Sequence, residues 1–325
     1  MLADKLARVP IAHLPTPLEP LPRLTAQLGG PELWIKRDDQ TGLATGGNKS
    51  RKLEFLVADA QAVGADTLIT GGAAQSNHAR QTAAAAAKFG LACRLVLRGE
   101  EPLQVRGNLL LDRLLGADVV WAGDSPLAEV MERVAEELRA AGRRPYVVPY
   151  GGSNPVGASG YVAAMEELLA QCKGRALHFE HVVLPSSSGG TQAGMAVGAR
   201  SLGFEGRILG ISIDLKADEL QRLLADLAMA TAQRLGLELA FAPGDFAVND
   251  DYLGGGYGVV SDLEREAIRT LARVEGVLLD PVYTGRALGG LLALVRQGAF
   301  RANERVLFWH TGGTAGLFGS EYELI

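Results

Sequence analysis

The apolar positions of this chain alternate between two spacings along its first half. Residues 49–66 (KSRKLEFLVADAQAVGAD) carry apolar side chains three and four positions apart, the spacing of one buried helix face, and the run TLIT follows directly. Three similar pairs follow, each a periodic segment leading into a short run typical of a strand. The three helices are expected over 78–90, 105–118 and 126–142. The pattern therefore predicts four helix–strand units within residues 52–150.

The second half of the sequence repeats this alternation. Strands are expected at HVVLP (181–185), RILGISI (207–213), VLLD (277–280) and RVLFWH (305–310). Helices are expected through Glu166 and Leu169, from Thr191, and over 217–235, 261–275 and 284–297. Alternating helices and strands need right-handed crossovers, which build mainly parallel sheets flanked by helices on both faces. The predicted fold class is α/β.

Composition narrows the class of protein. The 325 residues are 47% apolar and 21% charged, which suits a globular chain with one large domain or two ordinary ones. With 37 acidic and 32 basic residues the net charge is −5, so we expect no basic surface for nucleic acid. No apolar run approaches the about 18–20 residues of a membrane span, and the first residues lack a signal-peptide core. We expect a soluble, cytoplasmic protein with no membrane partner.

Several common catalytic and metal-binding patterns are missing from the sequence. The two cysteines, Cys93 and Cys172, form neither a disulfide framework nor a metal-ligand spacing, and the five histidines do not cluster. No G-x-S-x-G, H-E-x-x-H or paired C-x-x-C motif occurs. Serine-hydrolase and metallohydrolase functions are therefore disfavoured, and no metal site is expected.

Loops of small polar residues follow several of the expected strands. Ligands of parallel α/β sheets bind beyond the carboxyl ends of the strands, where helix N-termini offer free N–H groups. The segments GGAAQSNH, SSSGGTQAG, PVYTG and TGGTAG each follow an expected strand, and WIKRDD leads into QTGLATGGNKS. We expect these five loops to form one composite site.

The segment SSSGGTQAG is the candidate phosphate-binding loop. Its small residues allow successive backbone N–H groups and the following helix dipole to surround a phosphate, although they also suit an ordinary tight turn. Gly189, Gly190 and Gly194 do not have the G-x-G-x-x-G spacing of a dinucleotide site. Because Asp214 follows the next strand and imitates a ribose-binding acid, a nicotinamide-dependent dehydrogenase stays a weak alternative.

Lys49 is the candidate nucleophile. It starts a helix after GLATGG, but Asn48 separates it from Gly47, so the Walker A spacing fails. A helix N-terminus opposes a cation, which lowers the pKa of a lysine placed there and favours a Schiff-base nucleophile. A solvated surface lysine is the alternative. His78 in QSNH is either a base or, as we favour from its position alone, a neighbour of a helix cap.

A set of longer strings resembles one enzyme family. LPTPLEPL, IKRDD, TGGNKSRKLEFL, QSNHARQTAA, GGSN, DPVYTG and FWHTGG, spread from about residue 10 to about residue 320, resemble the pyridoxal-phosphate-dependent D-cysteine desulfhydrase and 1-aminocyclopropane-1-carboxylate deaminase family. The resemblance implies the fold of the tryptophan synthase β subunit (fold type II), with pyridoxal 5'-phosphate between two domains. It also implies a small domain at 52–160, a large one at 1–51 and 161–325, and a homodimer.

The resemblance also assigns roles to individual residues. Lys49 matches the lysine that binds the cofactor covalently, Asn77 the partner of the cofactor's phenolic oxygen, and Thr311 the partner of the pyridine nitrogen. The phosphate-binding residues are expected to be Ser187, Ser188, Gly189, Gly190 and Thr191. The other expected catalytic residues are Ser76, Tyr257 and Tyr283. The expected substrate-binding residues are Ser76, Asn77, His78, Tyr283 and Thr284.

Thr284 distinguishes the two activities named in the family. The deaminase activity is expected to need a glutamate directly after the second tyrosine, because a carboxylate near the pyridine nitrogen would keep that nitrogen protonated. Here the residue is Thr284. The resemblance therefore favours β-elimination of a sulfur-containing amino acid, with D-cysteine giving pyruvate, sulfide and ammonia. An L-cysteate sulfo-lyase is the nearest alternative; the deaminase and a non-catalytic amino-acid or nucleotide-binding protein follow.

Overall fold

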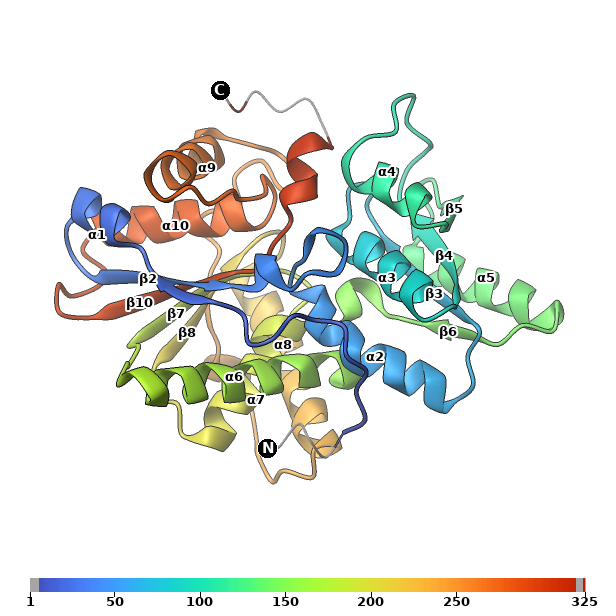
Figure 1. Ribbon diagram of the computed structural model, residues 1–325, viewed down its shortest axis with the longest axis horizontal. Coiled ribbons are helices and arrows are strands. Elements are labelled where there is room, and N and C mark those ends of the chain that lie inside the picture. Colours follow the sequence, from blue (N-terminus) through green and yellow to red (C-terminus); the bar gives the residue numbers. More distant parts are fainter. Residues whose placement is uncertain (1–5, 320–323, 325) are drawn as a thin grey trace.

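Two sheets divide the chain (Figure 1), as a computed structural model that describes residues 6–319 and residue 324 shows. The larger sheet has the strand order β1-β2-β10-β7-β8-β9, and the smaller has the order β5-β4-β3-β6. All neighbouring strands are parallel except β1 and β2. The strands are β1 (Leu18–Pro20), β2 (Glu32–Arg37), β3 (Thr67–Gly72), β4 (Ala92–Leu97), β5 (Asp118–Trp121), β6 (Pro145–Val147), β7 (His181–Ser186), β8 (Arg207–Ser212), β9 (Ala247–Asn249) and β10 (Arg305–His310).

Helices cover both faces of each sheet. The helices are α1 (Pro22–Leu28), α2 (Lys49–Ala62), α3 (Asn77–Lys88), α4 (Gly107–Leu114), α5 (Leu127–Ala140), α6 (Pro155–Arg175), α7 (Gly190–Leu202), α8 (Ala217–Arg234), α9 (Asp262–Glu275) and α10 (Thr284–Arg296). Figure 1 shows α1, α9 and α10 above the large sheet and α6 and α7 below it. In the small sheet α5 packs on one face and α3 on the other. The predicted α/β class is confirmed.

Two segments differ from the predicted elements. Residues 277–280 form no strand, although Leu279 is fully buried and the carbonyl oxygen of Leu278 lies 2.9 Å from Nε2 of His310. Val277 and Leu279 are buried and Leu278 is half exposed, so the segment has the alternating pattern of a strand with one buried face, which explains the error. The sequence analysis assigned no element to the proline-rich segment near the N-terminus, which forms β1 and then α1, whose first residue is Pro22.

The expected domain boundaries stay a prediction. The small sheet, from Thr67 to Val147, falls within the predicted small domain of residues 52–160. Residues 1–5, 320–323 and 325 of the predicted large domain lie outside the described residues. In the part of the chain that the structure describes, no helix combines the length and the apolar run needed to cross a bilayer.

Candidate active site

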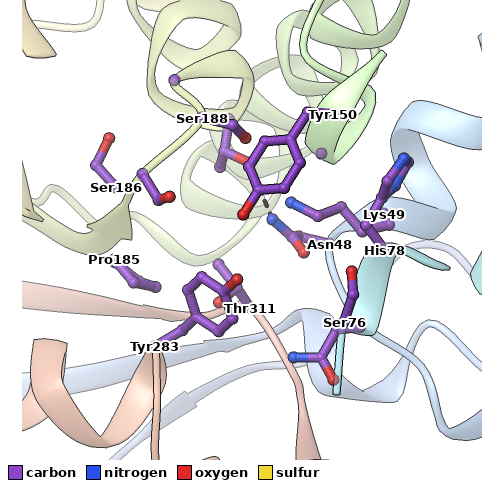
Figure 2. Close-up of a pocket in the computed structure, with 15 residues that line it drawn as sticks. Asn48, Lys49, Ser76, His78, Tyr150, Pro185, Ser186, Ser188, Tyr283 and Thr311 are labelled. Carbon is purple, nitrogen blue, oxygen red and sulfur yellow. Dashed lines mark hydrogen bonds between the residues drawn. The ribbon is translucent and has the colours of Figure 1, made fainter. Parts of the chain in front are cut away.

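One cleft lies at the carboxyl ends of strands from both sheets. The empty space within it, including space open to solvent, is about 610 Å³. Each of the five polar loops singled out in the sequence contributes to its wall (Figure 2). The lining residues are Asn48, Lys49, Ser76, Asn77, His78, Tyr150, Gly151, Pro185, Ser186, Ser187, Ser188, Gly189, Thr191, Tyr283 and Thr311. The expected composite site is therefore formed.

Backbone geometry places Lys49 at the centre of this cleft. Gly46 and Gly47 have φ values of +70° and +129°, and a Cβ at Gly46 would collide with the carbonyl oxygen of Asp39. The next residue, Asn48, donates from its backbone N–H to the Thr311 carbonyl oxygen at 2.9 Å and from Nδ2 to Thr191 Oγ1 at 3.0 Å. Three loops are thus joined around the first residue of α2, and Figure 2 shows the Lys49 amine pointing into the space between them.

A buried ion network fixes α2 behind Lys49. Arg51 donates to both oxygens of Asp38, at 2.8 and 2.9 Å, and its guanidinium also binds Glu167 of α6. Asp38 accepts further hydrogen bonds from the Tyr161 hydroxyl at 2.6 Å and the Trp309 indole at 2.8 Å. Burial alone would raise the pKa of Asp38, but the charge of Arg51 outweighs it and lowers that pKa. The helix start is therefore held rigidly.

Two lysines share the buried end of the cleft. Burial lowers the pKa of Lys49 to about 8. Lys52, one helical turn later and 1% exposed, donates to the Gly151 carbonyl oxygen and the Ser153 hydroxyl. Burial and the adjacent Lys49 lower the pKa of Lys52 well below its usual value. An anion bound here would relieve the repulsion between the two amines.

The N-terminus of α7 faces these lysines. Gly189 has φ +80°, and a Cβ on Gly190 would lie 2.6 Å from Ser153 Oγ and 2.8 Å from Lys52 Nζ. The hydroxyl of Ser186 is buried and has no hydrogen-bond partner among the described residues. By contrast, Ser187 donates to Asp214 at 3.0 Å. Free first-turn N–H groups, an unsatisfied hydroxyl and the nearby Lys52 amine together suit a phosphate group.

The N-terminus of α3 forms the opposite wall. Ser76 caps this helix by accepting from the Ala79 N–H at 3.2 Å. His78 Nε2 lies 2.9 Å from the Thr70 hydroxyl, and burial with the charges of Lys49 and Lys52 lowers the pKa of His78 well below its usual value. His78 is therefore a neutral ring, so any anion at this wall would be held by helix N–H groups.

Tyrosines border the cleft on the side of the large sheet. The hydroxyls of Tyr257 and Tyr283 lie 2.7 Å apart, and their rings meet edge to face with centroids 5.9 Å apart. Burial and the neighbouring Tyr257 raise the pKa of Tyr283 well above its usual value, so this hydroxyl keeps its proton at neutral pH. Tyr283 lines the cleft, whereas Tyr257 lies behind it. Tyr257 and Tyr150 also line an adjoining groove.

Three of the predicted site residues do not line the cleft: Tyr257, Thr284 and Gly190. Thr284 is fully buried, donates from Oγ1 to Asp280 at 2.6 Å, and accepts from the Asp280 N–H at 2.8 Å. This closed pair turns its hydroxyl away from the cleft, so direct contact with substrate, as predicted for Thr284, is not supported. Gly190 lies just behind the lining residues, where its N–H donates to Ser153 Oγ at 3.1 Å.

Comparison with known proteins identifies the family. The family model described as "Pyridoxal-phosphate dependent enzyme" matches residues 9–312. This chain belongs to that family. The D-cysteine desulfhydrase of Klebsiella pneumoniae (strain 342) is 46% identical over 98% of this chain and 98% of its own length. The predicted cofactor and enzyme class are therefore confirmed, and the dehydrogenase and non-catalytic alternatives are not supported.

Solved structures give the same picture of the fold. The structure described as an ACC deaminase homologue superposes with a TM-score of 0.90 at 40% identity, covering 98% of this chain and 95% of the other. A threonine deaminase isoform from Solanum lycopersicum gives a TM-score of 0.66 at 20% identity, covering 92% and 79% of the two chains. The predicted fold-type II architecture of these pyridoxal-phosphate-dependent enzymes is confirmed.

The sequence analysis missed several residues at this site. Tyr150 follows β6, so the rule that ligands bind beyond strand carboxyl ends could have identified it. Lys52 lies three residues after Lys49, and helical spacing places both on one face. Ser153 and Asp280 lie in the quoted strings GGSN and DPVYTG, but no role was assigned to them, because their importance depends on contacts with Gly190 and Thr284.

Proposed function

We propose that this chain catalyses the β-elimination of D-cysteine, with water, to pyruvate, sulfide and ammonium. The observation that carries the proposal is the 46% identity, over nearly the whole of both chains, to a D-cysteine desulfhydrase. Thr284, in the position where the deaminase activity is expected to need a glutamate, supports the same choice.

The residues present fit pyridoxal phosphate. Lys49 Nζ would hold the cofactor covalently, with the phosphate at the N-terminus of α7 beside Lys52 and the phenolic oxygen toward Asn77. Thr311 is proposed as the partner of the pyridine nitrogen. The fit is supported by the unsatisfied Ser186 hydroxyl and by the buried Lys52 amine beside the N-terminus of α7.

Bound pyridoxal phosphate supplies an electron sink for the negative charge that develops at the substrate α-carbon. We propose that the substrate carboxylate binds at the N-terminus of α3, beside the Ser76 hydroxyl and the N–H groups of the first turn. Once the substrate amine has displaced it from the cofactor, Lys49 Nζ takes the α-proton, since burial lowers the pKa of this amine to about 8 and so gives it a larger neutral fraction near neutral pH than a solvated lysine has.

The tyrosine pair is the proposed acid for the departing sulfur. Tyr283 reaches the cleft with a protonated hydroxyl, and its Oη lies 2.7 Å from that of Tyr257. A proton given from Tyr283 Oη to sulfur can be replaced from Tyr257 across this short hydrogen bond. Lys49 and Tyr283 approach the substrate from different walls, which favours removal of the α-proton from one enantiomer only.

A side-by-side assay tests the substrate. Pyruvate release should be fastest from D-cysteine, with L-cysteine and 1-aminocyclopropane-1-carboxylate at least ~10-fold slower in kcat/KM, a gap of about 1.4 kcal/mol in barrier. Sulfite release from L-cysteate that outpaced sulfide release from D-cysteine would transfer the assignment to a sulfo-lyase. Faster ring opening than elimination would instead indicate a deaminase.

The cellular location, oligomeric state and domain boundaries of the enzyme are a further part of this proposal. We infer a cytoplasmic homodimer with a small domain at 52–160, in keeping with two free cysteines, both buried, among the described residues. Light scattering during size-exclusion chromatography measures the oligomeric state, and a monomer at micromolar concentration would contradict this inference.

A further inference from the structure

Arg80, on the first turn of α3, is a buried cation without an ion-pair partner. Its side chain is fully buried, and among the described residues no carboxylate forms an ion pair with it; Asp112 and Asp280 act on its charge only from a longer distance. Its Nη1 and Nη2 donate to three uncharged oxygens: Asn77 Oδ1 at 3.2 Å, Asn108 Oδ1 at 2.7 Å and the Gly46 carbonyl at 2.9 Å. Its buried Nε has no hydrogen-bond partner among the described residues. Since a buried unpaired charge is costly, these three bonds must be well formed to hold it.

Two hydrogen bonds, one from Arg80 and one from Asn108, determine which way the Asn77 amide faces. Asn77 Oδ1 accepts from Arg80 and also from Asn108 Nδ2, at 2.9 Å. Asn108 is itself fully buried and is fixed by Gln75, whose carbonyl oxygen accepts from its Nδ2 and whose Oε1 accepts from its N–H, both at 2.9 Å. Both donors therefore hold the oxygen of the Asn77 amide at the back of the cleft.

The other end of the same amide is free to bind a ligand. Asn77 lines the cleft, and among the described residues no acceptor receives a hydrogen bond from its Nδ2. Gly313, with φ +107°, lets this nitrogen approach the loop after β10, because a Cβ there would lie 2.8 Å from Nδ2. A donor presented in this way suits an anionic oxygen of the cofactor ring.

We propose that Asn108 and Arg80 are positioning residues that orient the Asn77 amide, so that its Nδ2 and not its Oδ1 faces the cofactor. The inference rests on the proposed role of Asn77 at the phenolic oxygen of pyridoxal phosphate. Arg80 additionally joins this amide to Gly46, in the loop that leads to Lys49. Arg80 thereby contacts both Asn77 and the loop that leads to Lys49, the two residues proposed to contact the reactive end of the cofactor.

Asn108→Asp is the sharpest perturbation. It keeps the size of the side chain and an acceptor for Arg80, but it replaces the Nδ2 donor by an oxygen that repels Asn77 Oδ1. The Asn77 amide should then rotate and direct its oxygen at the cofactor. Titration of pyridoxal phosphate into apoprotein should show binding about 3- to 10-fold weaker, the effect of one lost hydrogen bond, with a shifted visible band.

A double-mutant cycle separates orientation from general packing. Asn77→Ala should weaken cofactor binding by a similar factor, and adding Asn108→Asp to Asn77→Ala should cause no further loss. If Asn108→Asp weakens binding by the same factor in both backgrounds, the proposal is overturned. Should this variant prove insoluble, Asn108→Ala in the same cycle decides the question by the same non-additivity.

Asn303→Asp is the matched control. It makes the same exchange of amide for carboxylate at an exposed asparagine in the turn before β10. Cofactor affinity should stay within about twofold of wild type, and an effect as large as that of Asn108→Asp would overturn the proposal. Wild-type affinity in Asn77→Ala would overturn it as well. D-cysteine turnover, measured separately on wild type, reports on the proposed function alone.

Discussion

Adding one carbon atom at Gly190 tests the proposed phosphate site. A Cβ there would lie 2.6 Å from Ser153 Oγ, 2.8 Å from Lys52 Nζ and 3.0 Å from Ser153 Cα. The backbone has little freedom to retreat, because the Gly190 N–H donates to Ser153 Oγ at 3.1 Å and to the Ser188 carbonyl oxygen at 3.0 Å. Gly190→Ala must therefore displace the groups proposed to surround the phosphate.

The expected size follows from the cost of overpacking. Forcing one extra carbon into a filled site costs about 1–3 kcal/mol, which corresponds to roughly 5- to 150-fold weaker binding if the cost falls on the phosphate site. Ser187→Ala should weaken binding much less, by no more than about threefold, because its hydroxyl is bonded to Asp214. The two variants thus separate backbone shape from hydroxyl chemistry.

The assay is equilibrium titration of apoprotein with pyridoxal phosphate, followed by the visible absorbance. Gly174→Ala is the control, since this glycine of α6 has no atom within 4 Å of an added Cβ and should bind the cofactor like wild type. Wild-type affinity in Gly190→Ala, or equal losses in Gly190→Ala and Ser187→Ala, would refute the assignment of this loop to the phosphate.

Three further outcomes are expected. Lys49→Ala should abolish the visible band of the purified protein, and borohydride-stable attachment of cofactor to that variant would assign the anchor to another lysine. Capture of pyridoxal phosphate by wild-type apoprotein should accelerate as pH rises through about 8, where the buried Lys49 amine loses its proton, and then level off; a midpoint near 10.5 would contradict this. Arg286→Met, which leaves the fully buried Glu264 without its 2.6 Å partner, should lower the free energy of unfolding in urea by about 3–5 kcal/mol. Arg296→Met on the same helix, at a half-exposed ion pair, should lower it by only ~0–1 kcal/mol.

Periodicity predicted most of the fold, most directly for helices that bury one face, such as α5 and α9, and for inner strands that are buried on both. The long helices α2, α5 and α9 begin within a few residues of the expected positions, and α9 carries the Ser261 and Glu264 capping box in its sequence. The strand predicted at 277–280 was wrong because the segment is apolar but pairs with no sheet. An apolar segment with alternating burial can pack without a strand partner, and composition alone does not reveal whether a sheet edge is available.

The candidate site was predictable where a loop follows a strand and carries its chemistry in consecutive residues, as at Lys49 and at residues 187–191. Residues that act through distant contacts were not. Asn108 lies in a helix with an ordinary amphipathic pattern, and its contact with Asn77 joins positions 31 residues apart. Only the packing of α4 against α3 brings the two amides together.

The contact between Asp280 and Thr284 changes what the sequence alone implies about Thr284. The sequence places no acid directly after Tyr283, yet the buried Asp280 carboxylate lies 2.6 Å from the Thr284 hydroxyl. Its oxygens also accept backbone N–H groups of Val282, Tyr283 and Thr284 at 2.7–3.0 Å, so the carboxylate acts as a helix cap that is closed off from the cleft. A glutamate at position 284 would meet this carboxylate as a like charge, and one of the two would have to bind a proton. The difference between threonine and glutamate at this site is therefore a difference in the whole cap of α10, not in one side chain.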